Sequence, residues 1–174
     1  SGICHTDLHA INGSGDKKPI LPLIPGHEGV GVIEALGSKV TGFSLDQKAL
    51  IPWVGRTCRT CSFCSSGKEN YCDRQFNTGY VIPGTHAEYT TADFRYILPL
   101  PKDIDPVQVA PLACAGLTAF ETVKKLRSNE NQTLLIMGVG GVGHLAIQYA
   151  KEFFTRIIAI DPSEIRIAQA KLLG

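Results

Sequence analysis

The sequence has no marked excess of charge of either sign. Its 174 residues contain 17 Lys and Arg against 16 Asp and Glu, which gives a net charge of +1 at pH 7. No basic block stands out along the chain. Proteins that bind nucleic acid use clustered basic side chains to displace counterions from the phosphate backbone. We therefore expect no nucleic-acid partner.

Long hydrophobic runs are also missing. The longest ones, at residues 134–137 and 157–160, are as long as β-strands, whereas roughly 20 apolar residues are needed to cross a bilayer. The first residues carry neither an initiator Met nor the charged and then apolar profile of a secretory signal. These absences predict no membrane partner and favour the cytoplasm, a reducing compartment.

The texture of the sequence changes along the chain. Up to about residue 100, short extended stretches alternate with Gly- and Pro-containing loops, at residues 29–36, 49–54, 87–91 and 96–98. This alternation is typical of a β-rich domain. Helix-compatible runs then lead to an apolar strand, a glycine cluster, an amphipathic stretch at 142–154 and a second strand and helix. That order predicts a parallel α/β sheet, and because such sheets usually continue, we expect both chain ends to be cut.

Four of the six cysteines lie close together, at positions 58, 61, 64 and 72. Their segment is rich in Arg, Ser, Gly and Asn and has little apolar surface, so a zinc ion held by four thiolates could fold it. The alternatives are a pair of disulfides, which a reducing compartment disfavours, and an iron–sulfur cluster, whose usual spacings differ. The pattern predicts a structural zinc site with ligands Cys58, Cys61, Cys64 and Cys72.

The remaining cysteines, Cys4 and Cys114, could form a second site with His27. A mixed Cys, His, Cys set leaves the fourth position of a tetrahedral zinc open, as catalytic sites require. Taken singly, each cysteine also fits a buried apolar thiol, and His27 fits a hydrogen-bonded core residue. The residues alone leave both interpretations open.

A glycine cluster at residues 138–143 fits the pattern G-x-G-x-x-G, between an apolar strand and a helical pattern. Such glycines permit a tight turn and let a pyrophosphate approach a helix N-terminus. Asp161 ends the next strand and could hold a ribose 2′-hydroxyl while repelling a 2′-phosphate, which predicts NAD rather than NADP. The expected cofactor-binding residues of this motif are Gly138, Gly140, Gly141, Gly143 and Asp161.

The chain resembles the zinc-dependent medium-chain alcohol dehydrogenases over essentially its whole length. The segments that carry the likeness are Cys4-His5-Thr6-Asp7, then Gly26-His27-Glu28-x-x-Gly31 with Gly37 and Val40, the four-cysteine segment, and Cys114-Ala115-Gly116. The resemblance implies a β-rich, GroES-like catalytic domain over residues 1–115 with a structural zinc lobe at 55–75. The start of an α/β Rossmann domain, a doubly wound parallel sheet, would follow over 116–174.

The resemblance also implies a role for each residue of the second site. Cys4, His27 and Cys114 would bind a catalytic zinc. Asp7 would orient His27 from behind, and Glu28 would lie behind the metal. With the four-cysteine lobe, this makes two zinc ions per chain.

Further roles follow from the same resemblance. Thr6 matches a hydroxyl that accepts the alcohol proton, and His9 matches an imidazole that passes it to solvent through the cofactor ribose. His5 would approach the cofactor pyrophosphate. Trp53 matches a substrate-pocket tryptophan whose bulk favours small alcohols, although by itself it fits a core aromatic.

Two residues of the glycine-motif region gain roles in the same way. Val142 resembles a side chain that packs behind the nicotinamide. Arg166 stands where the family often has a basic residue at the ribose, and it fits a solvated helix residue equally well.

The implied reaction is the reversible oxidation of small primary or secondary alcohols by NAD⁺ to aldehydes or ketones. Cys114 favours a simple alcohol, because related polyol dehydrogenases usually carry Glu there. The full-length enzyme would be a homo-oligomer, a dimer or a tetramer. The alternative is a zinc-binding fragment or interaction module without turnover, because the family's members are much longer.

Three segments depart from the family's usual pattern. Arg59 replaces a common Gly, residues 45–48 replace a Gly-Asp-Arg-like turn, and Gly84-Thr85-His86 replaces a Gly-Gly-aromatic stretch. Because Gly often marks a positive φ, we expect strained backbone at Leu45 and at Arg59. We expect His86 to be structural.

Overall fold

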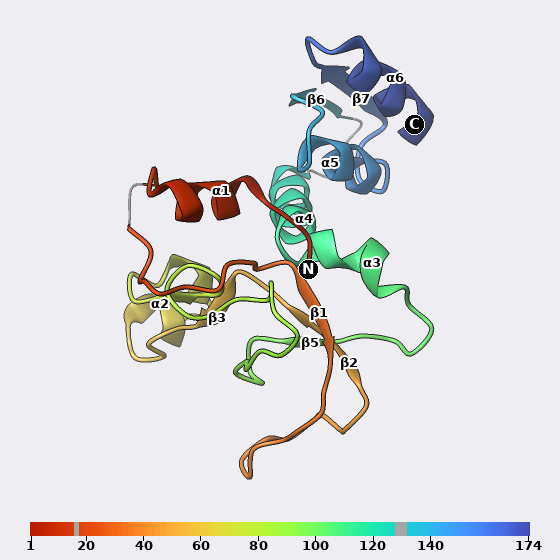
Figure 1. Cartoon of the computed structure of the whole chain (residues 1–174). Coiled ribbons are helices and arrows are strands. Elements are labelled where there is room, and N and C mark those ends of the chain that lie inside the picture. The colour runs from red at the N-terminus through yellow and green to blue at the C-terminus, as the bar shows by residue number, and fades with distance from the viewer. Residues whose placement is uncertain (16–17, 128–131) are drawn as a thin grey trace. The chain divides into compact units, whose positions relative to one another are not determined.

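The computed structural model describes residues 1–15, 18–127 and 132–174 (Figure 1). The chain divides into two compact units, Ser1–Cys114 and Ala115–Gly174, each with its own core. Within the described ranges, every helix is too short or too polar to cross a membrane.

The first unit is built on a three-stranded antiparallel sheet of order β1-β2-β5. Its strands are β1 (Gly29–Val32), β2 (Lys48–Ile51) and β5 (Leu98–Pro99). The helix η2 (Ala110–Ala113) follows α3 (Pro106–Val109) and packs against β1 and β2. Buried β2 side chains and the small residues of η2 form the core of this unit.

A strand pair holds together the two ends of the four-cysteine segment. β3 (Val54–Arg56) pairs antiparallel with β4 (Phe76–Asn77), and α2 (Ser62–Ser65) and η1 (Glu69–Tyr71) lie between them in sequence. The Arg56 guanidinium lies 4.0 Å from the centre of the Phe76 ring, a cation–π contact across the pair.

Helix α1 (His5–Asn12) begins directly after Cys4 and ends at Gly13, whose φ is 64°. The Asp7 carboxylate accepts a hydrogen bond from the Cys4 backbone N–H at 2.8 Å, which satisfies a donor at the N-terminus of the helix. His5, Thr6 and His9 are therefore carried on one anchored helix.

The second unit contains a parallel strand pair and three helices. Its elements are α4 (Ala115–Leu126), β6 (Thr133–Met137), α5 (Gly143–Ala150), β7 (Arg156–Ile160) and α6 (Glu164–Leu173). β6 and β7 pair in parallel with α5 between them, which makes a βαβ unit. Ile136, Ile147 and Ala170 share one buried cluster, and Val123 of α4 is buried in a second one with Phe154.

The observed strands refine the sequence prediction. The stretch 29–36 forms a strand only to Val32, and the stretch 49–54 becomes β2 and β3, with a break between them. The prediction of a strand at 87–91 is wrong. Those residues line a groove of about 640 Å³ opposite residues 29–37 instead of joining a backbone ladder.

Candidate metal centres and cofactor motif

The four-cysteine lobe brings its sulfur atoms to metal-binding distances. The Sγ atoms of Cys58, Cys61, Cys64 and Cys72 lie within 4.8 Å of one another. Neighbouring pairs are 3.5 to 3.9 Å apart, and all four cysteines are free. Sulfur atoms about 2.3 Å from a tetrahedral zinc are about 3.8 Å apart, whereas a disulfide needs about 2.05 Å. The spacing fits a zinc ion.

Backbone and hydroxyl donors surround these sulfurs. The backbone N–H of Thr60 is the main cause that lowers the pKa of the Cys58 thiol to about 5. The Thr57 hydroxyl, 3.4 Å from the Cys64 sulfur, lowers the pKa of Cys64. At Cys61 the Cys64 N–H favours the thiolate, but burial and the neighbouring thiols outweigh it and raise the pKa to about 11.

Arg59 adopts a left-handed backbone with φ of 58°, and its N–H helps to lower the pKa of Cys64. The expectation of positive φ at this position is confirmed. At Leu45 the expectation of positive φ is wrong, because the residue with positive φ in the turn at 45–48 is Asp46, at 63°. The unfavourable backbone conformation at Arg59 therefore places its N–H where it can donate to the Cys64 sulfur.

Side chains other than the cysteines also support this lobe, and no motif in the sequence indicated them. The Thr57 hydroxyl is 2.7 Å from the Tyr96 hydroxyl, which donates to a Glu69 carboxylate oxygen at 3.2 Å. Thr57 is buried. Its place directly before Cys58 was the one available signal, whereas Tyr96 is distant in sequence.

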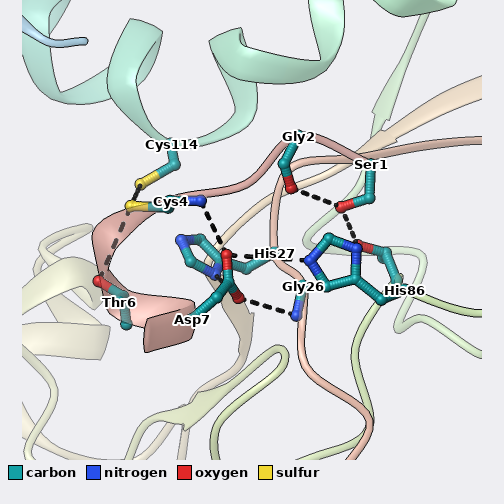
Figure 2. A network of polar contacts seen from close by, with 10 residues as sticks. Ser1, Gly2, Cys4, Thr6, Asp7, Gly26, His27, His86 and Cys114 are labelled. Carbon is teal, nitrogen blue, oxygen red and sulfur yellow. Dashed lines mark hydrogen bonds and ion pairs between the residues drawn. The ribbon is translucent and has the colours of Figure 1, made fainter. Parts of the chain in front are cut away.

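The second cluster unites residues from three parts of the first unit (Figure 2). Ligand atoms of Cys4, His27, Glu28 and Cys114 lie within 4.8 Å of one another, and the Cys4 and Cys114 sulfurs are 4.0 Å apart. Cys4 precedes α1, His27 and Glu28 precede β1, and Cys114 follows η2. The fold thus brings together side chains up to 110 positions apart.

The His27 ring supports a metal at this cluster. Its side chain is 1% exposed, and neither ring nitrogen has a hydrogen-bond partner among the described residues. Nδ1 does lie 3.4 Å from Asp7 Oδ1, an ion-pair distance without hydrogen-bond geometry. A buried polar atom without a partner costs about 1–3 kcal/mol. A bond to a metal would satisfy one of these nitrogens, so the residues fit zinc.

The electrostatics of the cluster also suit a cation. The Cys114 thiol, and then the His27 ring, lower the pKa of Cys4 to about 3, while the Cys4 sulfur raises the pKa of Cys114. Burial lowers the pKa of His27, but Cys4 and Asp7 outweigh it and raise the pKa overall. The buried Glu28 adds a further carboxylate.

Asp7 joins two of the three segments that carry the candidate ligands, those of Cys4 and His27. One carboxylate oxygen accepts the Cys4 N–H at 2.8 Å and the other accepts the Gly26 N–H at 2.9 Å. The side chain is 3% exposed. This buried carboxylate fixes the backbone on both sides of the cluster and faces the His27 ring.

The remaining predicted residues of this unit lie around the cluster. The Thr6 hydroxyl is 3.8 Å from the Cys4 sulfur. His9 Nδ1 is 2.9 Å from the Ser14 hydroxyl, and its ring lies 4.8 Å from that of His5. The Trp53 ring packs edge-on against His27 with centroids 4.9 Å apart.

The glycine motif forms a turn between β6 and α5. Gly138 has φ of 92°, and its N–H donates to the Ile160 carbonyl at 2.7 Å. A Cβ at Gly143 would overlap the Gly138 carbonyl oxygen, so only glycine fits there. A Cβ at Gly140 or Gly141 would meet nothing within 4 Å, which leaves room for a ligand to approach the turn.

Asp161 closes this turn from the end of β7. Its two oxygens accept the backbone N–H groups of Val139 at 2.8 Å and Ser163 at 2.9 Å. The Ser163 N–H is the main cause that lowers the pKa of Asp161, and Arg166, 3.5 Å away, adds to it. Val142, 44% exposed, directly precedes α5.

The β-rich first unit, with its two groups of side chains that could hold a metal ion, has the architecture of a GroES-like domain. Residues 1–102 match the family described as the alcohol dehydrogenase GroES-like domain. The chain belongs to this family, which comprises the zinc-type medium-chain alcohol dehydrogenases. The predicted resemblance and the predicted fold class are confirmed.

The chain is similar to several alcohol dehydrogenases. It is 43% identical over 173 residues to one from Geobacillus stearothermophilus, covering 99% of this chain and 51% of the relative. It is 40% identical to one from Moraxella sp. (strain TAE123), covering 100% of this chain and 52% of the relative. The crystal structure of the alcohol dehydrogenase from Aeropyrum pernix superposes with a TM-score of 0.89 at 36% identity, and the match covers 100% of this chain and 53% of that one. The chain spans about half the length of these relatives.

Proposed function

We propose that the chain is the metal-site portion, with part of the cofactor domain, of a zinc- and NAD-dependent alcohol dehydrogenase. It would oxidise small primary or secondary alcohols to aldehydes or ketones, and catalyse the reverse reaction. The observation that carries this proposal is the convergence of Cys4 and Cys114 on the buried His27 ring, whose nitrogens lack a hydrogen-bond partner among the described residues.

The side chains of the cluster would have three roles at the substrate, namely metal binding, proton acceptance and orientation of the histidine ligand. A zinc ion held by Cys4, His27 and Cys114 would supply a Lewis acid that makes the alcohol hydroxyl more acidic. The Thr6 hydroxyl, close to the Cys4 sulfur, would accept the proton from that hydroxyl. Asp7 would keep His27 oriented.

The proton then needs a way to solvent, and the substrate needs a limit on its size. His9, whose Nδ1 contacts Ser14, would pass the proton outward. Trp53, packed on His27, would restrict the pocket to small alcohols. Glu28 would hold negative charge behind the metal.

The glycine turn would bind the cofactor pyrophosphate at its open side. His5 would also bind the cofactor at its pyrophosphate. NAD⁺ would supply the hydride acceptor. Asp161 would hold the adenosine ribose, with Arg166 beside it, and Val142 would pack behind the nicotinamide.

The four-cysteine lobe would hold a second zinc with a purely structural role. The six free cysteines support a reducing compartment, which we propose is the cytoplasm. The complete enzyme would be a homo-oligomer.

The test is an assay of NAD⁺ reduction by ethanol, followed by NADH absorbance, on zinc-loaded protein. We expect ethanol-dependent NADH formation that falls by at least about a hundredfold in His27→Asn, since a metal ligand is lost. NADH formation that His27→Asn leaves unchanged would contradict the proposal.

A second candidate is a zinc-binding module without turnover, which the coverage of only about half of each relative favours. Two zinc ions per chain without any NADH formation would support this candidate over the first.

A further inference from the structure

His86 flanks the buried Asp7 carboxylate on the oxygen that His27 does not face (Figure 2). His27 Nδ1 lies 3.4 Å from Asp7 Oδ1, whereas His86 Nε2 lies 3.9 Å from Asp7 Oδ2. Asp7 is 3% exposed and His86 is 28% exposed. The carboxylate therefore lies between two imidazoles, one buried and one partly exposed.

The backbone of His86 is attached to the segment that leads into His27. Its N–H donates to the Pro25 carbonyl at 3.0 Å, and the Thr85 N–H donates to the Gly26 carbonyl at 3.0 Å. A Cβ at Gly26, where φ is 97°, would lie 2.8 Å from the His86 ring. The ring is thus fixed against the Gly26 backbone, with Nε2 toward Asp7.

Asp7 contacts two kinds of groups, backbone N–H donors and the side chain of His86. The N–H groups of Cys4 and Gly26 hold one oxygen each, and both belong to the backbone. His86 adds a side-chain nitrogen 3.9 Å from the oxygen remote from His27, an ion-pair distance that is longer than a hydrogen bond. An aromatic residue at position 86, as in the family's usual pattern, would provide the packing but no nitrogen.

We propose that His86 is a positioning residue of the Cys4, His27 and Cys114 site. It holds the Asp7 carboxylate and, through it, the orientation of the His27 ring toward a bound metal. The inference rests on the proposed zinc site. Loss of a carboxylate partner of a ligating histidine typically changes metal affinity 10–100-fold, so a residue one contact further out should change it about threefold to tenfold.

Two substitutions separate positioning from packing. His86→Phe keeps a ring against Gly26 but has no side-chain nitrogen, and His86→Gln gives up the ring but keeps a polar side-chain nitrogen. The zinc dissociation constant of the site is measured by competition with a chromophoric chelator. We expect His86→Phe to weaken zinc binding about threefold to tenfold and His86→Gln to stay within about twofold. The reverse order, or no change in either variant, would overturn the proposal.

Cadmium NMR provides the second readout, because a four-thiolate site and a mixed thiolate and imidazole site have different cadmium shifts. The mixed-site resonance should move in His86→Phe, while the resonance of the four-cysteine lobe stays in place. Movement of both resonances, or of the lobe alone, would indicate a general structural effect and would overturn the proposal.

Asp7→Asn shows whether the effect passes through Asp7 and whether the site exists. In that background His86→Phe should have no further effect, and an undiminished effect would overturn the proposal. If Asp7→Asn weakens zinc binding but His86→Phe does not, the inference fails and the zinc site stands. If the unsubstituted chain gives no mixed-site cadmium resonance, the proposed function fails as well.

Discussion

Thiols within each cluster differ in charge before any metal binds. At the second site, Cys4 has a pKa of about 3, whereas the pKa of Cys114 is raised. In the lobe, the pKa is about 5 for Cys58 and about 11 for Cys61. Each cluster therefore holds at least one thiolate at neutral pH, ready to attract a cation.

This asymmetry predicts the order of alkylation in zinc-free protein at pH 7. Thiols whose pKa lies below 7 are thiolates and react, so Cys4 and Cys58 should be modified by iodoacetamide before Cys114 and Cys61. Peptide mass spectrometry over a time course measures the order. Zinc-loaded protein, in which all four should be protected, is the control. Modification of Cys61 or Cys114 first would contradict the assignment.

Trp53 is predicted to set the size of the alcohol. Its ring packs edge-on against the His27 ring. It makes a second edge-on contact with the Tyr80 ring, with the ring centroids 5.7 Å apart. Trp53→Ala should raise the ratio of kcat/KM for hexanol over ethanol by roughly tenfold, because a larger apolar substrate can fill the space. Phe63→Leu, in the four-cysteine lobe, serves as the control. An unchanged ratio in Trp53→Ala would contradict the prediction, because it would mean that Trp53 does not line the alcohol pocket.

Among single residues, backbone conformation could be predicted from the sequence at one position, whereas contacts between distant side chains could not. The positive φ at Arg59 was predictable, because a glycine is usual at that position and Arg59 must adopt the same backbone. The Thr57 contact with Tyr96 and the His86 contact with Asp7 were not, because each joins residues far apart in sequence. Spacing patterns predict candidate ligands, but the side chains that support those ligands have no fixed spacing.

At the scale of elements, the glycine turn between β6 and α5 illustrates two different uses of glycine. Gly143 allows the start of α5 to approach the end of β6 closely, because a Cβ there would overlap the Gly138 carbonyl. Gly141 faces open space. The first glycine is required by packing, and the second is available to a ligand.

A matched pair of alanine substitutions tests this difference. Gly143→Ala should lower the free energy of unfolding by about 2 kcal/mol, because the methyl group forces the strand and helix apart. Gly141→Ala should change it by less than about 0.5 kcal/mol but weaken NADH binding. Urea unfolding followed by circular dichroism and NADH fluorescence titration measure the two effects. Equal destabilisation by both would contradict the account of the turn.

The βαβ order of the second unit was predicted from its apolar strands and glycine cluster, since both features are local in sequence. The strands of the first unit were harder to predict. Residues 87–91 have an extended pattern but line a groove instead of pairing, and residues 49–54 are interrupted between β2 and β3. Pairing depends on a partner strand, which the pattern of one segment does not specify.

At the scale of the whole molecule, the two units use different means of stabilisation. The second unit has two buried apolar clusters. The first unit has a three-stranded sheet, a two-stranded sheet and two groups of side chains that could hold a metal ion, one of them in a segment with little buried apolar surface. Metal binding is therefore expected to contribute directly to the stability of the first unit.

The most direct test of the account is the zinc content per chain, measured by plasma emission spectrometry on protein purified without added zinc. We predict two zinc ions in the unsubstituted chain, and one each in Cys114→Ser and Cys61→Ser, because each variant breaks a single cluster. Two zinc ions that persist in Cys114→Ser, or no zinc in the unsubstituted chain, would contradict the central claim that Cys4, His27 and Cys114 form a metal site.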